Sequence, residues 1–196
     1  MTPKSRTAPP LRVVRTPPAS SAPPADVLLT VGSAEDLDAL YRRYARYVAA
    51  VATRLLGRSD EVDDLVQDVF LAALRGVSSL RDAQAIKGWL AKVTVRLALK
   101  RLRRRRLLQA LHLERALADY QQLAAAGTSV AQREQLARVY RVLDRLPPRT
   151  RVIWLLRHVL DEPLHAIVGL SGCSQSTVQR KLRDAESFLA EELHHA

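Results

Sequence analysis

The feature of this sequence with the clearest chemistry is a run of cations near its middle. Seven Lys or Arg side chains and no carboxylate occur in the eleven residues 96–106. Like charges on one helix repel by roughly 0.2–0.5 kcal/mol per pair, and a phosphate backbone turns this repulsion into attraction. The run therefore predicts a nucleic-acid contact. The alternative is a solvated helix end whose cations favour the helix dipole.

A second cluster has the opposite charge. Residues 60–70 contain no basic residue and five carboxylates, which are Asp60, Glu61, Asp63, Asp64 and Asp68. Carboxylates at the start of a helix can simply complement its dipole. The whole chain has a formal net charge of +11. A separate acidic face in such a chain can also bind a cationic surface of a partner protein, but not DNA. Both interpretations stay open on the sequence alone.

The third candidate is a helix near the C-terminus that follows a tight turn at Gly172. Ser174 is placed to cap this helix, and a step of 100° per residue puts polar side chains opposite its apolar stripe. Gln and Arg are the side chains that read base edges bidentately from a recognition helix, although a solvent-facing helix shows a similar pattern. The predicted DNA-contacting residues here are Gln175, Ser176, Thr177, Gln179, Arg180 and Arg183.

Three helices are predicted to position the first two clusters. Apolar residues recur every three or four positions in residues 36–57, 62–76 and 85–106, as on the buried face of a helix. The first two stripes are Leu37, Leu40, Tyr41, Tyr44, Val48, Val51 and Leu55, and then Val62, Leu65, Val66, Val69, Phe70, Ala73 and Leu74. Together the three helices predict one small domain over residues 31–108.

The rest of the chain divides into a tail, a linker and a second domain. Residues 1–30 form a predicted disordered tail, since seven of the ten prolines lie in the first 24 residues. Residues 109–132 are predicted to be a flexible linker whose first half can extend the preceding helix. Residues 133–193 show four short periodic segments, separated by Pro147–Pro148, Pro163 and Gly172. The last two segments predict a helix-turn-helix. The fold class is therefore all-α, with two small helical domains.

Composition excludes several classes of protein. A single cysteine, Cys173, permits no internal disulfide and no multi-cysteine zinc site, so we expect a reducing, cytoplasmic compartment. Cys173 itself is interpreted as a small apolar filler, with a redox switch as the alternative. No run of 18 apolar residues occurs, so membrane insertion is not expected. The sequence contains no phosphate-binding loop, nucleophile elbow or metal-ligand spacing, and we predict no enzyme activity, metal or cofactor.

Taken together, the two units resemble the sigma factors of bacterial RNA polymerase, and in particular the minimal extracytoplasmic-function (ECF) subgroup of the sigma-70 family. Five segments in the family's order carry the resemblance. They are LYRRYARYVAAVATRLLG (40–57), DDLVQDVFLAAL (63–74), IKGWLAKVTVRLALKRLRRR (86–105), LDRLPPRTRVIWLLRHV (143–159) and GCSQSTVQRKLRDAE (172–186).

The resemblance implies a role for each cluster. The first domain would be similar to sigma region 2 and the second to sigma region 4. Polymerase binding, on the β′ clamp coiled coil, is implied for Asp63, Asp64, Gln67 and Asp68. Contacts to the −10 promoter element, including capture of an unstacked base by the loop 80–84, are implied for Leu80, Arg81, Asp82, Gln84, Lys87, Arg96, Lys100, Arg101, Arg103 and Arg104. The residues of the C-terminal helix named above would read the −35 element, with region 4 on the polymerase β flap. The expected partners are core RNA polymerase and promoter DNA in the bacterial nucleoid, and sequestration by an anti-sigma factor is compatible with two such small domains.

Three alternatives compete with a sigma factor. A stand-alone helix-turn-helix regulator would bind DNA but leave the acidic cluster without a purpose. A basic RNA-binding protein would use the arginine run and need no recognition helix. A phosphodiester-cleaving enzyme is disfavoured, because no carboxylate cluster with metal geometry accompanies the basic residues. The chain also departs from the family pattern at Arg96, Lys100, Ala166 and Gln179, so the promoter sequence does not follow from the resemblance.

Overall fold

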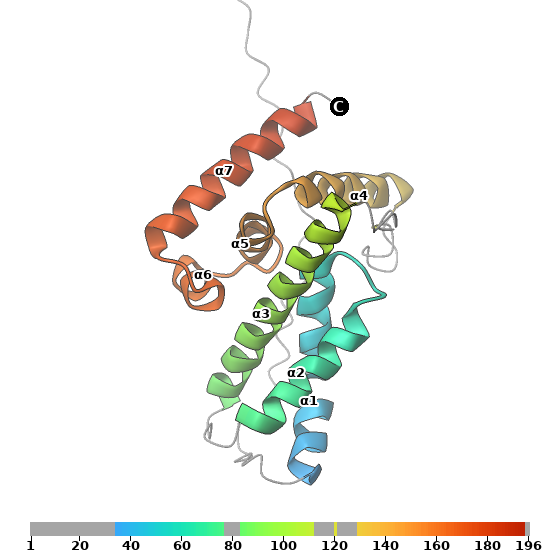
Figure 1. Ribbon diagram of the computed structural model, residues 1–196, viewed down its shortest axis with the longest axis vertical. Coiled ribbons are helices and arrows are strands. Elements are labelled where there is room, and N and C mark those ends of the chain that lie inside the picture. Colours follow the sequence, from blue (N-terminus) through green and yellow to red (C-terminus); the bar gives the residue numbers. More distant parts are fainter. Residues whose placement is uncertain (1–33, 77–82, 112–119, 121–128, 195–196) are drawn as a thin grey trace, which may run out of the picture.

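The structure, a computed structural model, describes residues 34–76, 83–111, 120 and 129–194. These ranges contain helices and no strand, which confirms the all-α prediction (Figure 1). The helices are α1 (Ala34–Leu56), α2 (Val62–Gly76), α3 (Ala83–Ala110), α4 (Val130–Arg145), α5 (Pro148–His158), α6 (Leu164–Ser171) and α7 (Gln175–His194). The predicted tail (1–30), most of the predicted base-capturing loop (80–82) and most of the predicted linker (109–132) lie outside the described residues.

Helices α1, α2 and α3 pack against one another as the predicted three-helix unit. Their apolar stripes meet in a core that includes Leu40, Leu55, Leu65 and Leu90, all with no exposed surface. Helix α1 ends at Gly57, whose φ of +72° is the left-handed conformation that glycine adopts without a Cβ penalty. The chain then turns into α2, which carries Asp63 and Asp64 in its first turn, where carboxylates favour the helix dipole.

Two residues of the predicted apolar stripes are not in this core. Tyr41 on α1 is 46% exposed and Leu74 on α2 is 45% exposed. Each lies at the edge of its stripe and is only partly covered by other residues. Tyr41 packs edge-on against Phe70 of α2, with ring centroids 4.9 Å apart.

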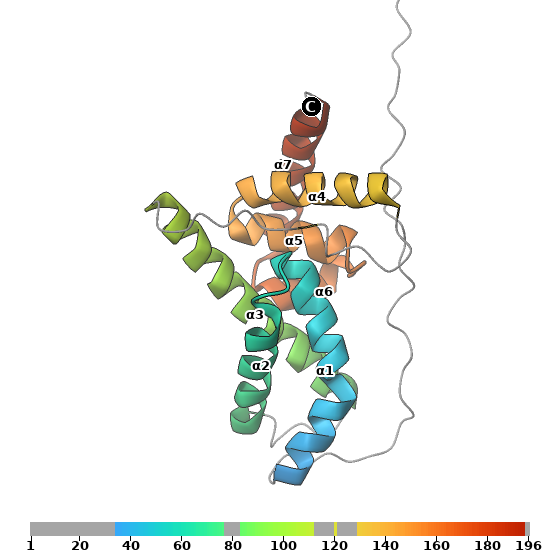
Figure 2. The same ribbon diagram turned by 90° about the vertical axis from the view of Figure 1, so that its right-hand side faces the viewer.

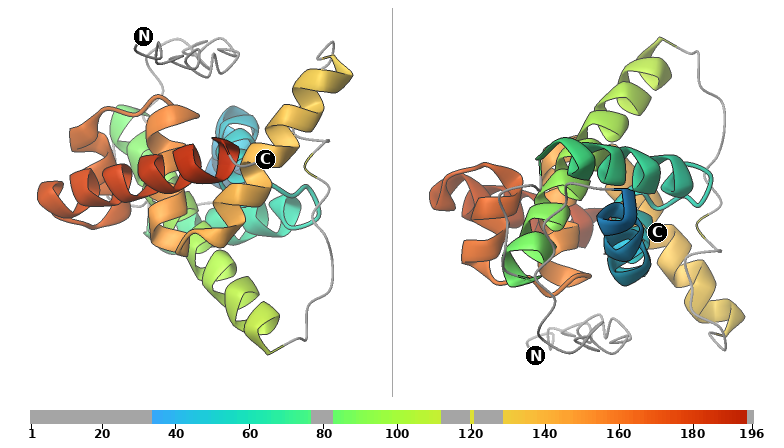
Figure 3. Two further views of the ribbon diagram at one scale, coloured as in Figure 1. Left: turned by 90° about the horizontal axis from the view of Figure 1, so that it is seen from above. Right: turned by 90° about the horizontal axis from the view of Figure 1, so that it is seen from below.

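Helix α3 is one continuous helix of 28 residues. It begins at Ala83, so Gln84 lies in its first turn and not in the loop that the resemblance implied. It runs through the whole basic run to Ala110, as the sequence allowed. Seen from above, its C-terminal end projects beyond the other helices (Figure 3).

The second unit is built by local signals at each helix boundary. Helix α4 starts three residues before the predicted position, because Ser129 and Gln132 form a reciprocal capping box. Pro147 and Pro148 occupy the cap and first position of α5, where a missing N–H costs nothing. Gly172, with φ of +64°, ends α6. Ser174 then caps α7 by accepting a hydrogen bond from the Thr177 N–H at 3.3 Å.

The two units do not lie apart. Helix α3 packs on α5 and α6, and α1 packs on α5, so that one apolar cluster extends through the described helices. Turning the molecule by 90° shows α5 and α6 beside α1 and α3, with α4 lying across one end (Figure 2). Within the described ranges, no helix is long and apolar enough to cross a membrane.

Candidate nucleic-acid interface

The basic run divides into an outward and an inward set. Five exposed cations along one side of α3 form what we call the cationic stripe, which consists of Lys92, Arg96, Lys100, Arg103 and Arg104. Arg106, at the end of the basic run, is exposed as well. Lys92 was not among the residues predicted from sequence. Its position four residues before Arg96 is the signal that would have found it, because residues four apart lie on the same side of a helix.

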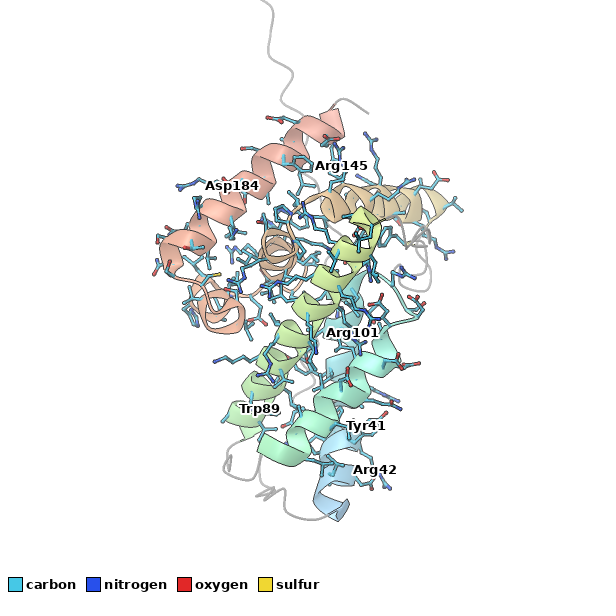
Figure 4. All side chains as sticks on the ribbon, in the orientation of Figure 1. Tyr41, Arg42, Trp89, Arg101, Arg145 and Asp184 are labelled. Carbon is cyan, nitrogen blue, oxygen red and sulfur yellow. The ribbon has the colours of Figure 1, made fainter. Side chains whose placement is uncertain are left out.

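Arg101 and Arg105 form the inward set. Arg101 donates to the Asp68 carboxylate at 2.7 Å and also to the Glu61 carbonyl (Figure 4). Arg105 is 6% exposed and donates to the Glu61 carboxylate at 3.0 Å and to the Leu56 carbonyl at 3.4 Å. Both arginines therefore hold the end of α3 against α2 and the turn that precedes it. Arg101 was placed among the −10 contacts on the resemblance, and here its guanidinium is committed to α2.

The acidic cluster is likewise divided by its contacts. Asp60 forms a bidentate pair with Arg58, at 2.6 and 3.0 Å, and this hydrogen-bonded cation lowers the pKa of Asp60. Four residues predicted to bind polymerase lie exposed on one side of α2, namely Asp63, Asp64, Gln67 and Asp68. Exposed Leu71, Leu74 and Tyr41 add an apolar part to the surface of α1 and α2. The sequence did not predict this apolar part.

Lys87 lies where the two units meet. Its Nζ is 5.0 Å from the centroid of the Tyr47 ring. Burial raises the pKa of Glu162, and the positive charge of Lys87 acts in the opposite direction. Burial also raises the pKa of Tyr47 to about 12. Lys87 is half-buried in this arrangement. Leu80, Arg81 and Asp82 lie outside the described residues.

The C-terminal helix presents the predicted face to solvent. Gln175, Ser176, Gln179, Arg180 and Arg183 are exposed, and Thr177 is half-buried with its hydroxyl 2.8 Å from that of Ser174. Contacts further along α7 fix its orientation. The Lys181 ammonium donates to the Thr150 hydroxyl at 3.4 Å, and Arg145 pairs with Glu192 and lies over the Phe188 ring. The recognition helix is thus held from both α4 and α5.

A buried polar joint connects the two units at the end of α1. Arg151 is 2% exposed, pairs with Asp144 and donates to the Leu56 carbonyl at 3.0 Å. Burial raises the pKa of Asp144 to about 6, against the opposing charges of Arg105 and Arg58, and lowers that of Arg151 to about 10. The Tyr140 hydroxyl donates to the Arg54 carbonyl at 2.9 Å, and burial raises its pKa to about 12.

The described residues offer no group of three His, Cys, Asp or Glu side chains that could hold a metal ion. Cys173 packs, half-buried, against the core beside the recognition helix, with the Arg149 guanidinium 3.8 Å from its Sγ. Trp154 is buried and Trp89 packs at the edge of the core.

Comparison with known proteins finds relatives over much of the chain. The family model described as Sigma-70 region 2 matches residues 40–107, which contain α2 and nearly all of α3. The ECF RNA polymerase sigma factor SigE of Mycolicibacterium smegmatis is 28% identical over 161 residues, which cover 78% of this chain and 61% of the relative. The RNA polymerase sigma factor SigV of Bacillus subtilis is 27% identical over 123 residues, covering 63% of this chain and 70% of the relative.

Two solved structures share the fold. The sigma factor RpoE of Bartonella quintana, in complex with the anti-sigma factor NepR, aligns with a TM-score of 0.60 at 21% identity, over 82% of this chain and 98% of that one. CnrH, in complex with the cytosolic domain of CnrY, aligns with a TM-score of 0.55 at 20% identity, over 85% of this chain and 93% of that one.

Residues 40–107 therefore match the Sigma-70 region 2 family, and the relatives that the chain resembles include ECF RNA polymerase sigma factors. Sigma factors are transcription initiation factors and not enzymes.

Proposed function

We propose that this chain binds core RNA polymerase and directs initiation at promoters with −35 and −10 elements, stabilising the melted −10 DNA. One observation carries the proposal: a single chain presents an exposed acidic and apolar surface on α2, a cationic stripe on α3 and an exposed recognition face on α7. A stand-alone DNA-binding regulator has no use for the first of these surfaces. The protein acts in the bacterial cytoplasm, at the nucleoid, and supplies no catalytic residue of its own.

Each surface has a proposed partner. Residues 31–108 form the unit that docks on the β′ clamp coiled coil through Asp63, Asp64, Gln67 and Asp68, with Leu71 and Leu74 as apolar neighbours. The same unit contacts the −10 element through Lys87 and the cationic stripe, while Arg101 positions α3 on α2. The final unit reads the −35 element through Gln175, Ser176, Thr177, Gln179, Arg180 and Arg183. An anti-sigma factor is a further proposed partner, supported by the complex of the structural neighbour RpoE with the anti-sigma factor NepR.

Run-off transcription with core polymerase tests the whole proposal. Templates carrying randomised promoters are transcribed with and without the protein. We expect transcripts that appear only with the protein, from templates that share two spaced elements. DNA binding without initiation would contradict the proposal and favour the stand-alone regulator.

Charge reversal on α2 tests the docking surface separately. We expect Asp64→Arg to weaken binding to core polymerase on the order of 100-fold, because the exposed carboxylate is replaced by a charge that repels a cationic partner. Fluorescence anisotropy of the labelled protein with core polymerase measures this affinity. Glu134→Arg, an equal charge change at an exposed site on α4, is the matched control. Equal affinities for the two variants would contradict docking through α2.

Base reading by α7 has its own test. Arg180 is exposed in the N-terminal half of the helix, and a bidentate Arg–base contact contributes about 1–3 kcal/mol of discrimination. We therefore expect Arg180→Ala to reduce the preference for the selected −35 sequence by roughly tenfold at one base pair, with other positions unchanged. Competition binding of the holoenzyme to single-base promoter variants measures it. Glu191→Ala, exposed near the other end of α7, should leave the preference intact, and a uniform loss across positions would show that Arg180 contacts phosphate instead.

A further inference from the structure

Tyr120 is a buried residue of the segment that joins α3 to α4. Only 2% of its surface is exposed. Its ring stacks on that of Tyr140 with centroids 5.4 Å apart and an angle of 29° between the planes. Its hydroxyl donates to one oxygen of the Asp144 carboxylate, and Arg151 donates to the other. Each oxygen of this mostly buried carboxylate thus has a donor, one from α5 and one from Tyr120.

One edge of the Tyr120 ring lies against Gly57, the residue that follows α1. A Cβ placed on Gly57 would come within 2.7 Å of Tyr120 Cε1, within 2.8 Å of Tyr140 Cδ1 and within 3.1 Å of an Arg151 nitrogen. Such approaches are shorter than van der Waals contact. The bare backbone of Gly57 is therefore what lets both rings reach α1.

These contacts form a socket for one aromatic ring with a hydroxyl group. The tyrosine socket consists of Gly57, Tyr140, Asp144 and Arg151. It draws one wall from α1 and the others from α4 and α5, and these belong to the two helical units. Because Tyr120 contacts both walls at once, moving α1 away from α4 and α5 uncovers the edge of its ring that faces Gly57.

We propose that Tyr120 is an intramolecular plug, which docks in the tyrosine socket and holds the two helical units together. Tyr120, which lies between α3 and α4 in the sequence, then fastens the two units. A force that draws Tyr120 away, or a partner that competes for the socket, releases α4–α7 from α1–α3. The plug itself follows from the contacts described here. Its consequence for promoter binding, that the two DNA-reading units can then separate, rests on the proposed function.

Small-angle X-ray scattering of the full chain without polymerase or DNA tests the plug. We expect the wild-type protein to be compact. Tyr120→Ala should raise the ratio of open to compact molecules at least tenfold, because an aromatic residue at the centre of an interface typically contributes more than the roughly 1.4 kcal/mol to which a tenfold change corresponds. Tyr120→Phe keeps the ring and should open the protein less. Tyr41→Ala is the matched control, because Tyr41 is a half-exposed tyrosine that contacts Phe70 within the first unit.

Chemical rescue distinguishes a socket from a general loss of packing. Millimolar 4-methylphenol, which carries the ring and hydroxyl of the deleted side chain, should restore compactness to Tyr120→Ala, and toluene, which lacks the hydroxyl, should restore less. Scattering of Tyr120→Ala that matches wild type would overturn the proposal, as would equal opening in Tyr41→Ala. Loss of helical circular dichroism in Tyr120→Ala would assign the residue to folding and would also overturn it. None of these outcomes depends on whether the chain is active with polymerase.

Discussion

Arg151→Met is expected to lower the free energy of unfolding by about 3 kcal/mol. The substitution leaves the Asp144 carboxylate without its buried ion-pair partner and the Leu56 carbonyl without its donor. Removal of one member of a buried pair costs more than the pair contributes, because an uncompensated charge stays in the interior. For a chain of this size the loss corresponds to a fall of about 9 °C in Tm, which differential scanning calorimetry measures.

Two controls isolate the buried pair. Arg157→Met changes the same residue type on the same helix at an exposed site and should cost about 0.5 kcal/mol or less. Arg151→Met combined with Asp144→Asn should recover part of the loss, since no uncompensated carboxylate remains. A loss in Arg151→Met as small as that in Arg157→Met would show that the joint does not contribute to stability.

The loss should also depend on pH. The pKa of Asp144 is raised to about 6 in the folded protein, above its ordinary value near 4. Because the pKa of Asp144 is higher in the folded than in the unfolded protein, this carboxyl group stabilises the fold at pH values below its pKa in the unfolded protein. The stabilisation is lost as the pH rises through its pKa in the folded protein. Without Arg151 the carboxyl gives up its proton still less readily. The difference between Arg151→Met and wild type should therefore be smaller at pH 5 than at pH 8.

Neutralising the cationic stripe is expected to have the largest effect on DNA binding. Replacing Arg96, Lys100 and Arg103 together by Gln removes three exposed charges from one side of α3. Each phosphate contact contributes close to one unit to the slope of log affinity against log salt. We expect that slope to become shallower by about 3, and the affinity for duplex DNA at low salt to fall on the order of 100-fold.

The matched control removes three exposed cations elsewhere, namely Arg42 and Arg46 on α1 and Arg141 on α4. It has the same net charge as the stripe variant, so an equal change in slope would show that only total charge matters. Arg101→Gln provides a second comparison. Because Arg101 holds α3 on α2 through Asp68 and Glu61, we expect this variant to lose stability with little change in the salt slope.

Most of the helices could be predicted from the sequence because their signals are local. Apolar spacing located α1 and α2, and Gly172 with Ser174 located the turn before α7, since a left-handed residue and a side-chain cap depend only on near neighbours. The start of α4 was placed too late. The Ser129–Gln132 capping box starts the helix at Val130, three residues before the predicted position.

The packing between the units could not be predicted in the same way. Helix α3 buries residues on more than one side, for example Leu90, Val93 and Val95, because it packs on α1 and α2 and also on α5 and α6. A helix covered from two directions loses the clear apolar stripe on which prediction depends. The sequence also could not predict that Arg101 and Arg105 point toward α2 rather than toward solvent. Their partners, Asp68 and Glu61, lie 33 and 44 residues away, and the run itself presents seven similar cations.

The continuity of α3 also sets a length scale for the nucleic acid beside it. Arg96, Lys100 and Arg104 are four residues apart, so they recur about every 6 Å along the helix axis. Successive nucleotides of one strand of B-form DNA rise about 3.4 Å, so alternate phosphates recur about every 6.8 Å. The two spacings are nearly equal. Along the axis of a duplex parallel to α3, the interval between two cations therefore corresponds to about two nucleotides, and the winding of the strand round that axis limits the contacts to the few phosphates that face α3.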